Sequence, residues 1–151
     1  MSALDPDRLI LTPQQIREVQ QFYDLIWKRR SEVSKLFYER LFEIAPDTRQ
    51  LFKPSMVEQR RQLMQALGFI VTRLHMPEQV LPSVKRLAVA HVGYGALPHH
   101  YGQVGAAMVA ALEGCFGDEF TPRLRASWAA AFGELARIMI SEAYPPDRRY
   151  G

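Results

Sequence analysis

Hydrophobic residues recur along this chain at spacings of three and four, which is the period of an amphipathic helix. The first such run forms one apolar face from Ile16, Val19, Phe22, Tyr23 and Ile26. Thr12 precedes this run as a helix cap, Pro13 suits the first helical position, and Gln15 completes a capping box. We expect this helix to end near residues 28–30, where basic side chains suit the negative end of the helix dipole.

Prolines and glycines mark where most of the later helices begin or end. We expect a second helix from a cap at Ser31 to a stop at Pro46, followed by a connector over 47–54. That connector carries Leu51 and Phe52, two large apolar residues in a polar segment. The remaining elements are expected in this order: a helix over about 55–74; a turn bracketed by Pro77 and Pro82; a short helix containing His91; a helix from about 98–101 to Gly117; a last helix opened by Thr121–Pro122 and closed by Pro145–Pro146. No segment alternates apolar and polar residues for long enough to form a sheet, so the pattern predicts an all-α fold.

Length and composition favour one domain. The 151 residues suit a single domain over 1–151 with a substantial core, an N-terminal extension at 1–11 and a C-terminal tail at 145–151. The net charge of +3 comes from scattered basic residues, and no nucleic-acid-binding motif occurs. Cys115 is the only cysteine, so no intrachain disulfide can form. With no signal core and no membrane-spanning run, we expect a cytoplasmic protein that binds neither nucleic acid nor membrane.

His91 is the first candidate for chemistry. It shares one face of its helix with Val84, Leu87 and Ala88. A neutral imidazole directed into an apolar pocket can serve as an axial ligand of haem iron. The alternative is a buried histidine that hydrogen-bonds a backbone carbonyl, and this stretch alone leaves both open.

Further residues at fixed spacings resemble those of the globins: Tyr38, Phe52, Gln59, Leu63, His91 and Tyr101. Segments 37–42, 51–52 and 100–105 are similar to those of bacterial single-domain globins, as are Trp128 and residues 132–133 of the last helix. The match is best with the branch that includes flavohaemoglobin haem domains and thermoglobins. The resemblance covers about residues 12–144. It implies a globin fold of about seven to eight helices around one haem b.

The resemblance also implies a role for each residue. His91 resembles the proximal haem ligand and is thus the candidate metal ligand, and Phe52 resembles the loop phenylalanine that stacks on the haem. Tyr38 and Gln59 resemble the distal polar pair that stabilises dioxygen by hydrogen bonding, and Leu63 resembles the apolar residue beside the gas. The alternative for Tyr38 is a core tyrosine whose hydroxyl bonds a backbone group. The alternative for Gln59 is a helix glutamine that faces solvent.

The proximal side departs from the flavohaemoglobin pattern. In that branch a glutamate of the last helix acts with the tyrosine matched by Tyr101 to polarise the proximal histidine. Ala143 occupies the glutamate's position here, and Glu142 lies one residue earlier, about 100° round the helix. Unless the helix end adjusts, we expect His91 to be less polarised, which weakens the case for peroxidase-like or dioxygenase chemistry.

The other histidines are expected outside the iron site. His75 follows Gln59 by 16 residues, which is roughly 24 Å along a straight helix and too far to reach the same iron. His99 and His100 lie at a helix start. We expect them at the surface or at the haem edge, where His100 would meet a propionate.

Several functions fit such a pocket. The first is reversible binding of dioxygen, for storage, delivery or scavenging, by five-coordinate ferrous iron. The second is nitric oxide dioxygenase activity, which needs a separate reductase because no room for one follows residue 144. The third is gas or redox sensing through a partner, and a haem-free helical interaction module is the remaining alternative. We expect a protein that binds dioxygen and other diatomic gases, as a monomer or weak homodimer.

Overall fold

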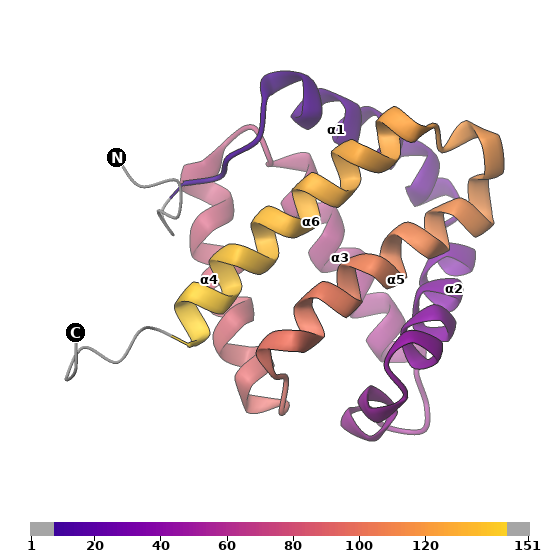
Figure 1. The fold of residues 1–151 in the computed structure, drawn as a ribbon, viewed down its shortest axis with the longest axis vertical. Coiled ribbons are helices and arrows are strands. Elements are labelled where there is room, and N and C mark those ends of the chain that lie inside the picture. Colours follow the sequence, from indigo (N-terminus) through magenta and orange to yellow (C-terminus); the bar gives the residue numbers. More distant parts are fainter. Residues whose placement is uncertain (1–7, 145–151) are drawn as a thin grey trace.

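A computed structural model describes residues 8–144 of the chain, and within this range six α-helices and two short 3-10 helices form a bundle (Figure 1). The α-helices are α1 (Pro13–Lys28), α2 (Arg30–Ile44), α3 (Val57–Thr72), α4 (Pro77–Gly93), α5 (Pro98–Phe116) and α6 (Pro122–Ala143). The 3-10 helices are η1 (Pro46–Leu51) and η2 (Gly117–Glu119). Residues 8–144 contain no strand, so the predicted all-α fold is confirmed.

Local capping determines where the first and last helices begin. The Thr12 Oγ1 accepts a hydrogen bond from the Gln15 amide at 3.1 Å, and the Gln15 Oε1 accepts one from the Thr12 amide at 2.9 Å. These two bonds form the predicted capping box and satisfy amides that the helix leaves unpaired. At the start of α6, the Thr121 Oγ1 accepts a bond from the Leu124 amide at 3.2 Å. Both boundaries therefore follow from a few neighbouring residues.

The predicted cap at Ser31 is wrong. The second helix already begins at Arg30, and no side chain caps it. Ser31 lies in the first turn of α2, where its carbonyl accepts a hydrogen bond from the Arg60 guanidinium at 2.9 Å. A contact with α3, distant in sequence, therefore accounts for Ser31 better than a local cap does.

The predicted turn between Pro77 and Pro82 is also wrong. Pro77 occupies the start of α4, and the helix continues through Pro82 to Gly93. Pro82 lacks the amide that would bond four residues back, which normally weakens a helix. The helix is retained here because Val80, Val84 and other apolar residues on both sides of Pro82 are buried in the core.

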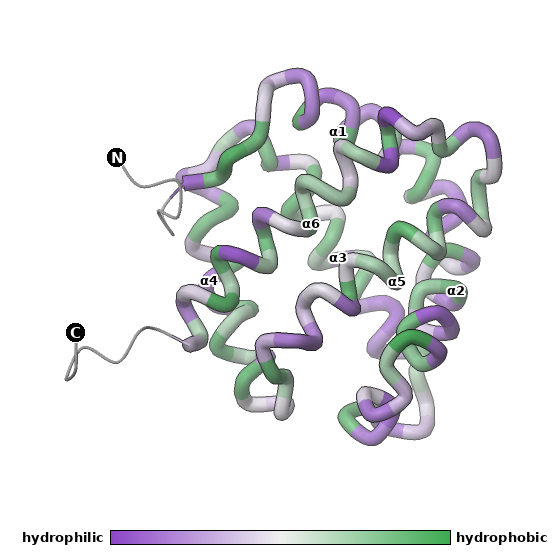
Figure 2. The backbone as a smooth tube through the Cα atoms, viewed as in Figure 1, coloured by the Kyte–Doolittle hydropathy of each residue, from purple (hydrophilic) through white to green (hydrophobic). Residues whose placement is uncertain are grey.

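The core lies between two groups of helices. In Figure 1, α5 and α6 cross the front of the molecule, and α3 and α4 lie behind them. Hydrophobic stretches recur along each helix between hydrophilic ones (Figure 2), and the inward-facing ones meet in the middle. The largest fully buried side chains come from five of the α-helices and from Leu74 in the turn after α3: Trp128, Ile26, Leu74, Met108, Leu112, Ile138, Val19, Val33, Val80 and Val84.

The segment before α1 packs against α6. The Ile10 amide donates a hydrogen bond to the Glu134 Oε1 at 2.6 Å, and Leu9 and Leu11 contact the hydrophobic core. The described part of the predicted N-terminal extension is therefore attached to the bundle. The predicted stop at Pro145–Pro146 and the tail at 145–151 lie outside the described residues.

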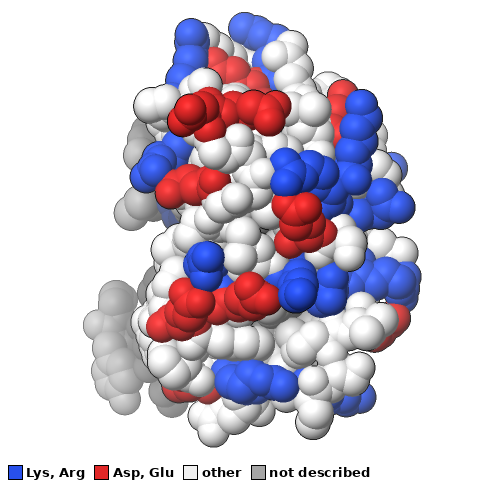
Figure 3. Space-filling view, turned by 90° about the vertical axis from the view of Figure 1, so that its right-hand side faces the viewer, with Lys and Arg blue, Asp and Glu red and all other residues white. Residues whose placement is uncertain are grey.

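The surface carries both signs of charge. On the side shown in Figure 3, which is the right-hand side of Figure 1, basic and acidic side chains are interspersed. Within residues 8–144, no helix is both long and apolar enough to span a membrane.

Candidate functional site

His91 lies in the last turn of α4, with its ring half-buried. Its Nδ1 is 2.6 Å from the Leu87 carbonyl oxygen, one turn earlier. A carbonyl oxygen only accepts, so Nδ1 carries the hydrogen and Nε2 keeps a free lone pair. No residue of 8–144 hydrogen-bonds Nε2. The carbonyl bond and the ligand role are therefore compatible, because the bond orients the ring and presents Nε2 to a metal.

Tyr101 lies beside His91, in the first turn of α5. The two ring centroids are 6.2 Å apart, and Tyr101 is only 8% exposed. Its hydroxyl is buried and has no hydrogen-bond partner among the described residues. Burial raises the pKa of Tyr101, and the nearby Tyr144 raises it further.

The structure does not bring Glu142 to Tyr101. Glu142 is exposed on the last turn of α6 and makes no hydrogen bond within residues 8–144. The residue that does reach this region is Tyr144, whose hydroxyl donates a hydrogen bond to the Ala96 carbonyl. In the described part of the chain, no carboxylate therefore polarises His91 through Tyr101.

Tyr38 and Gln59 come together from α2 and α3. Tyr38 is 6% exposed, and its ring meets that of Phe52 edge to face, with centroids 5.5 Å apart. Burial raises the pKa of Tyr38 to about 12, although a hydrogen bond with the Gln59 side chain lowers it in part. The Tyr38 hydroxyl therefore keeps its hydrogen at neutral pH. Leu63 follows Gln59 by one turn of α3 and packs against the core.

His100 does not lie at the surface, which excludes the first of the two places predicted for it and leaves the haem edge. It is 6% exposed, and both of its ring nitrogens are engaged. Its Nδ1 accepts a hydrogen bond from the Leu97 amide at 2.9 Å, and its Nε2 is 3.0 Å from the Asp47 Oδ2. A carboxylate at this distance disfavours the predicted contact with a second anion, the propionate.

Sequence reasoning missed Asp47, because its partner lies 53 residues away and no local pattern links the two. His99 is exposed, as predicted. His75 is exposed as well, and its Nδ1 lies 2.9 Å from the Gln20 amide nitrogen.

These side chains fit an iron porphyrin. His91 offers a neutral imidazole with a free nitrogen, and Tyr101 offers an unpartnered buried hydroxyl beside it. Tyr38 offers a protonated hydroxyl, and Phe52 an aromatic face. An all-α fold with this set of groups defines a helical haem protein.

The comparisons with known proteins agree with that class. The sequence model of the globin family matches residues 35–139. A flavohemoprotein of Deinococcus radiodurans is 31% identical over 134 residues, which are 87% of this chain and 33% of that protein. A flavohemoprotein of Rhodopirellula baltica has the same identity and coverage.

Solved structures share the fold. A bacterial globin from Campylobacter jejuni has a TM-score of 0.77 at 22% identity and covers 87% of this chain and 96% of its own. An engineered carbene transferase from Rhodothermus marinus has a TM-score of 0.79 at 24% identity, covering 88% and 93%.

The chain belongs to the globin family. Membership of this family implies that it binds haem. The chain spans about a third of the length of the flavohemoproteins it matches.

Proposed function

We propose that this chain binds haem b and uses it to bind dioxygen reversibly, with His91 as the protein ligand of the iron. The observation that carries the proposal is the 2.6 Å contact from the His91 Nδ1 to the Leu87 carbonyl, which leaves Nε2 free. Ferrous haem, when bound, supplies an iron with one further coordination position for a diatomic gas. Dioxygen storage, delivery or scavenging is the role that this arrangement serves.

On the proposed distal side, Tyr38 donates the hydrogen bond to the gas and Gln59 orients the Tyr38 hydroxyl. Support comes from the pKa of about 12 for Tyr38 and from its hydrogen bond with Gln59. Phe52 packs on Tyr38 at 5.5 Å between ring centroids and provides the proposed stacking surface for the porphyrin. Leu63 provides the apolar wall next to the gas.

On the proposed proximal side, the protein adds little negative charge to the imidazole of His91. Its Nδ1 bonds a neutral carbonyl, and the Tyr101 hydroxyl beside it has no carboxylate partner within residues 8–144. A weakly polarised imidazole donates less electron density to the iron, which favours reversible gas binding over oxidative chemistry.

Nitric oxide dioxygenase activity is the second candidate. It is favoured by the flavohemoprotein relatives. Each turnover consumes an electron, so the proposed partner is a reductase. Sensing through another partner is a third possibility. We further propose a cytoplasmic monomer or weak homodimer.

Titration with haem tests the main proposal. The wild-type chain and the His75→Ala variant are expected to bind one haem and give the same Soret band, because His75 is exposed and bonded to Gln20. His91→Ala is expected to lose stable haem binding or native ligation. A wild-type spectrum from His91→Ala would refute His91 as the ligand, and the absence of any Soret band in the wild type would favour the haem-free interaction module.

Kinetics then separate the two candidate functions. The reduced, haem-loaded protein is mixed with dioxygen and nitric oxide while a reductase and its electron donor are supplied. Reversible dioxygen binding with slow nitrate formation supports the first function, and rapid catalytic nitrate formation supports the second.

A further inference from the structure

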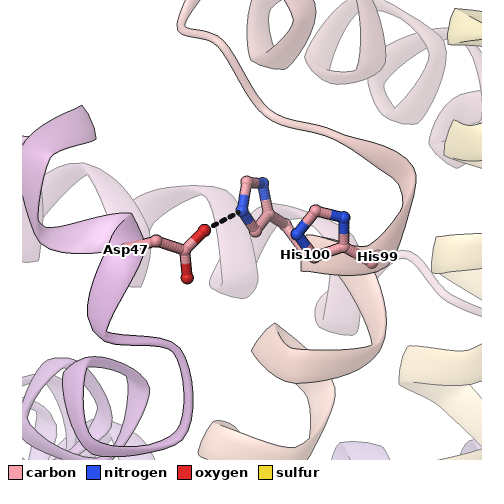
Figure 4. Close-up of side chains that lie close together, drawn as sticks. All are labelled: Asp47, His99 and His100. Atoms are coloured by element: carbon pink, nitrogen blue, oxygen red, sulfur yellow. Dashed lines mark hydrogen bonds and ion pairs between the residues drawn. The ribbon is translucent and has the colours of Figure 1, made fainter.

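We propose a second metal site, distinct from the haem iron, in which Asp47, His99 and His100 bind a divalent transition metal such as Zn²⁺. The three side chains lie together although they come from two separate segments (Figure 4). Asp47 is in the first turn of η1, and the two histidines are in the first turn of α5. A metal bound there would link these two segments.

The geometry is close to that of a metal site. One potential ligand atom from each residue lies within 4.8 Å of the others, and Nε2 of His100 is 3.0 Å from the Asp47 Oδ2. Tetrahedral zinc with bonds of about 2.1 Å holds its ligand atoms roughly 3.4 Å apart. The ligand atoms therefore need only a small movement toward one another to bind zinc. It can come from the two exposed members, since His99 is at the surface and the Asp47 side chain is 54% exposed.

The donor set determines which metals suit the site. Two imidazoles and one carboxylate match Zn²⁺, Cu²⁺ and Ni²⁺, whereas Mg²⁺ and Ca²⁺ prefer oxygen ligands alone. The Asp47 carboxylate lies in a largely exposed side chain and accepts a hydrogen bond from the His100 Nε2 at 3.0 Å. With three protein ligands, such a site keeps a fourth position for water.

The hydrogen bonds of His100 add a specific consequence. Because its Nδ1 accepts the Leu97 amide, its Nε2 carries the hydrogen and points at Asp47. For Nε2 to bind a metal, that hydrogen must move to Nδ1, and the Leu97 amide then loses its acceptor. Metal binding and this bond at the start of α5 therefore exclude each other.

Zinc titration of the haem-loaded protein tests the site, because haem occupies His91 and removes it from competition. Isothermal titration calorimetry with zinc chloride is expected to give saturable binding of one Zn²⁺ per chain. His99→Ala and Asp47→Asn each remove a ligand and are expected to weaken binding more than about tenfold. His75→Ala removes an exposed histidine elsewhere and serves as the matched control, with unchanged affinity.

Amide hydrogen exchange provides a second readout. Zn²⁺ is expected to speed exchange at Leu97 in the wild type but not in His99→Ala. The proposal is overturned if zinc does not saturate, if both ligand variants bind as tightly as the wild type, or if exchange at Leu97 is unaffected by bound zinc. The Soret band is recorded in parallel, so that a failure of haem binding is distinguished from a failure of this metal site.

Discussion

Tyr38→Phe isolates the proposed distal hydrogen bond, because it removes one hydroxyl and keeps the ring. The ring makes the packing contacts of this residue, at 4.8 Å from Phe37 and 5.5 Å from Phe52 between centroids. We therefore expect the variant to fold and to bind haem as the wild type does. What it loses is a donor that a pKa of about 12 keeps protonated at neutral pH.

The expected effect is a faster release of dioxygen. One hydrogen bond contributes about 1 kcal/mol net, which corresponds to roughly a fivefold change in the dissociation rate. The Gln59 amide can donate in place of the lost hydroxyl, so Tyr38→Phe combined with Gln59→Leu should release dioxygen faster than either single variant. The two effects should not add, because the two side chains share a hydrogen bond.

Stopped-flow measurement of dioxygen dissociation provides the assay, with Tyr23→Phe as the control. Tyr23 is also buried and its pKa is also raised to about 12 by burial, but its hydroxyl donates to the Met64 carbonyl at 3.3 Å. Tyr23→Phe should leave the rate unchanged. Equal rates in Tyr38→Phe and the wild type would remove Tyr38 from the distal role, and an equal acceleration in both variants would point to a general loosening of the fold.

Two further predictions concern stability. A Cβ added at Gly68 would lie 2.7 Å from the Tyr23 hydroxyl oxygen, so Gly68→Ala should lower the free energy of unfolding measured in urea. The loss should be about 1 kcal/mol smaller when Tyr23→Phe is also present, because the clashing hydroxyl is then absent. An equal loss with and without Tyr23→Phe would exclude this clash. Burial raises the pKa of Glu134, but hydrogen bonds from Arg137 and the Ile10 amide outweigh it and lower the pKa below 4.5. The stability that these bonds contribute is present above about pH 4.5 and is lost as pH falls through the folded-state pKa of Glu134. Glu134→Gln should therefore flatten the acid side of the plot of unfolding free energy against pH, measured by circular dichroism. An unchanged plot would contradict the coupling between Glu134 ionisation and stability.

Features that depend on near neighbours could be predicted from the sequence. Thr12 and Thr121 cap their helices through residues three positions away, and Gly117 ends α5 with a φ of +54°, where glycine is favoured. The same local rules failed at Ser31 and Pro82. At Ser31 a hydrogen bond with Arg60 of α3 outweighs the local preference for a cap. At Pro82 burial of the neighbouring residues outweighs the local preference for a turn.

The candidate site also contains features that the sequence could predict and features that it could not. The resemblance to globins was needed to propose Tyr38 and Gln59 as a polar pair, and the pKa of Tyr38 is lowered in part by the Gln59 side chain, in agreement with that proposal. The surroundings of His100 could not be predicted in this way. Its partner Asp47 is remote in sequence. The hydrogen bond from the Leu97 amide to the His100 Nδ1 involves a backbone donor, so no pattern of residue types in the sequence indicates it.

The hydrogen bonds of the two histidines explain why we propose His91 rather than His100 as the iron ligand. Both rings contact the backbone, but in opposite senses. The His91 Nδ1 donates to a carbonyl and leaves an unprotonated Nε2, which is the form that binds a metal directly. The His100 Nδ1 accepts from an amide, which leaves a hydrogen on Nε2 that a metal must first displace. We infer that His91 is preorganised for a permanent ligand, whereas a metal at His100 must compete with a structural hydrogen bond and is therefore held reversibly.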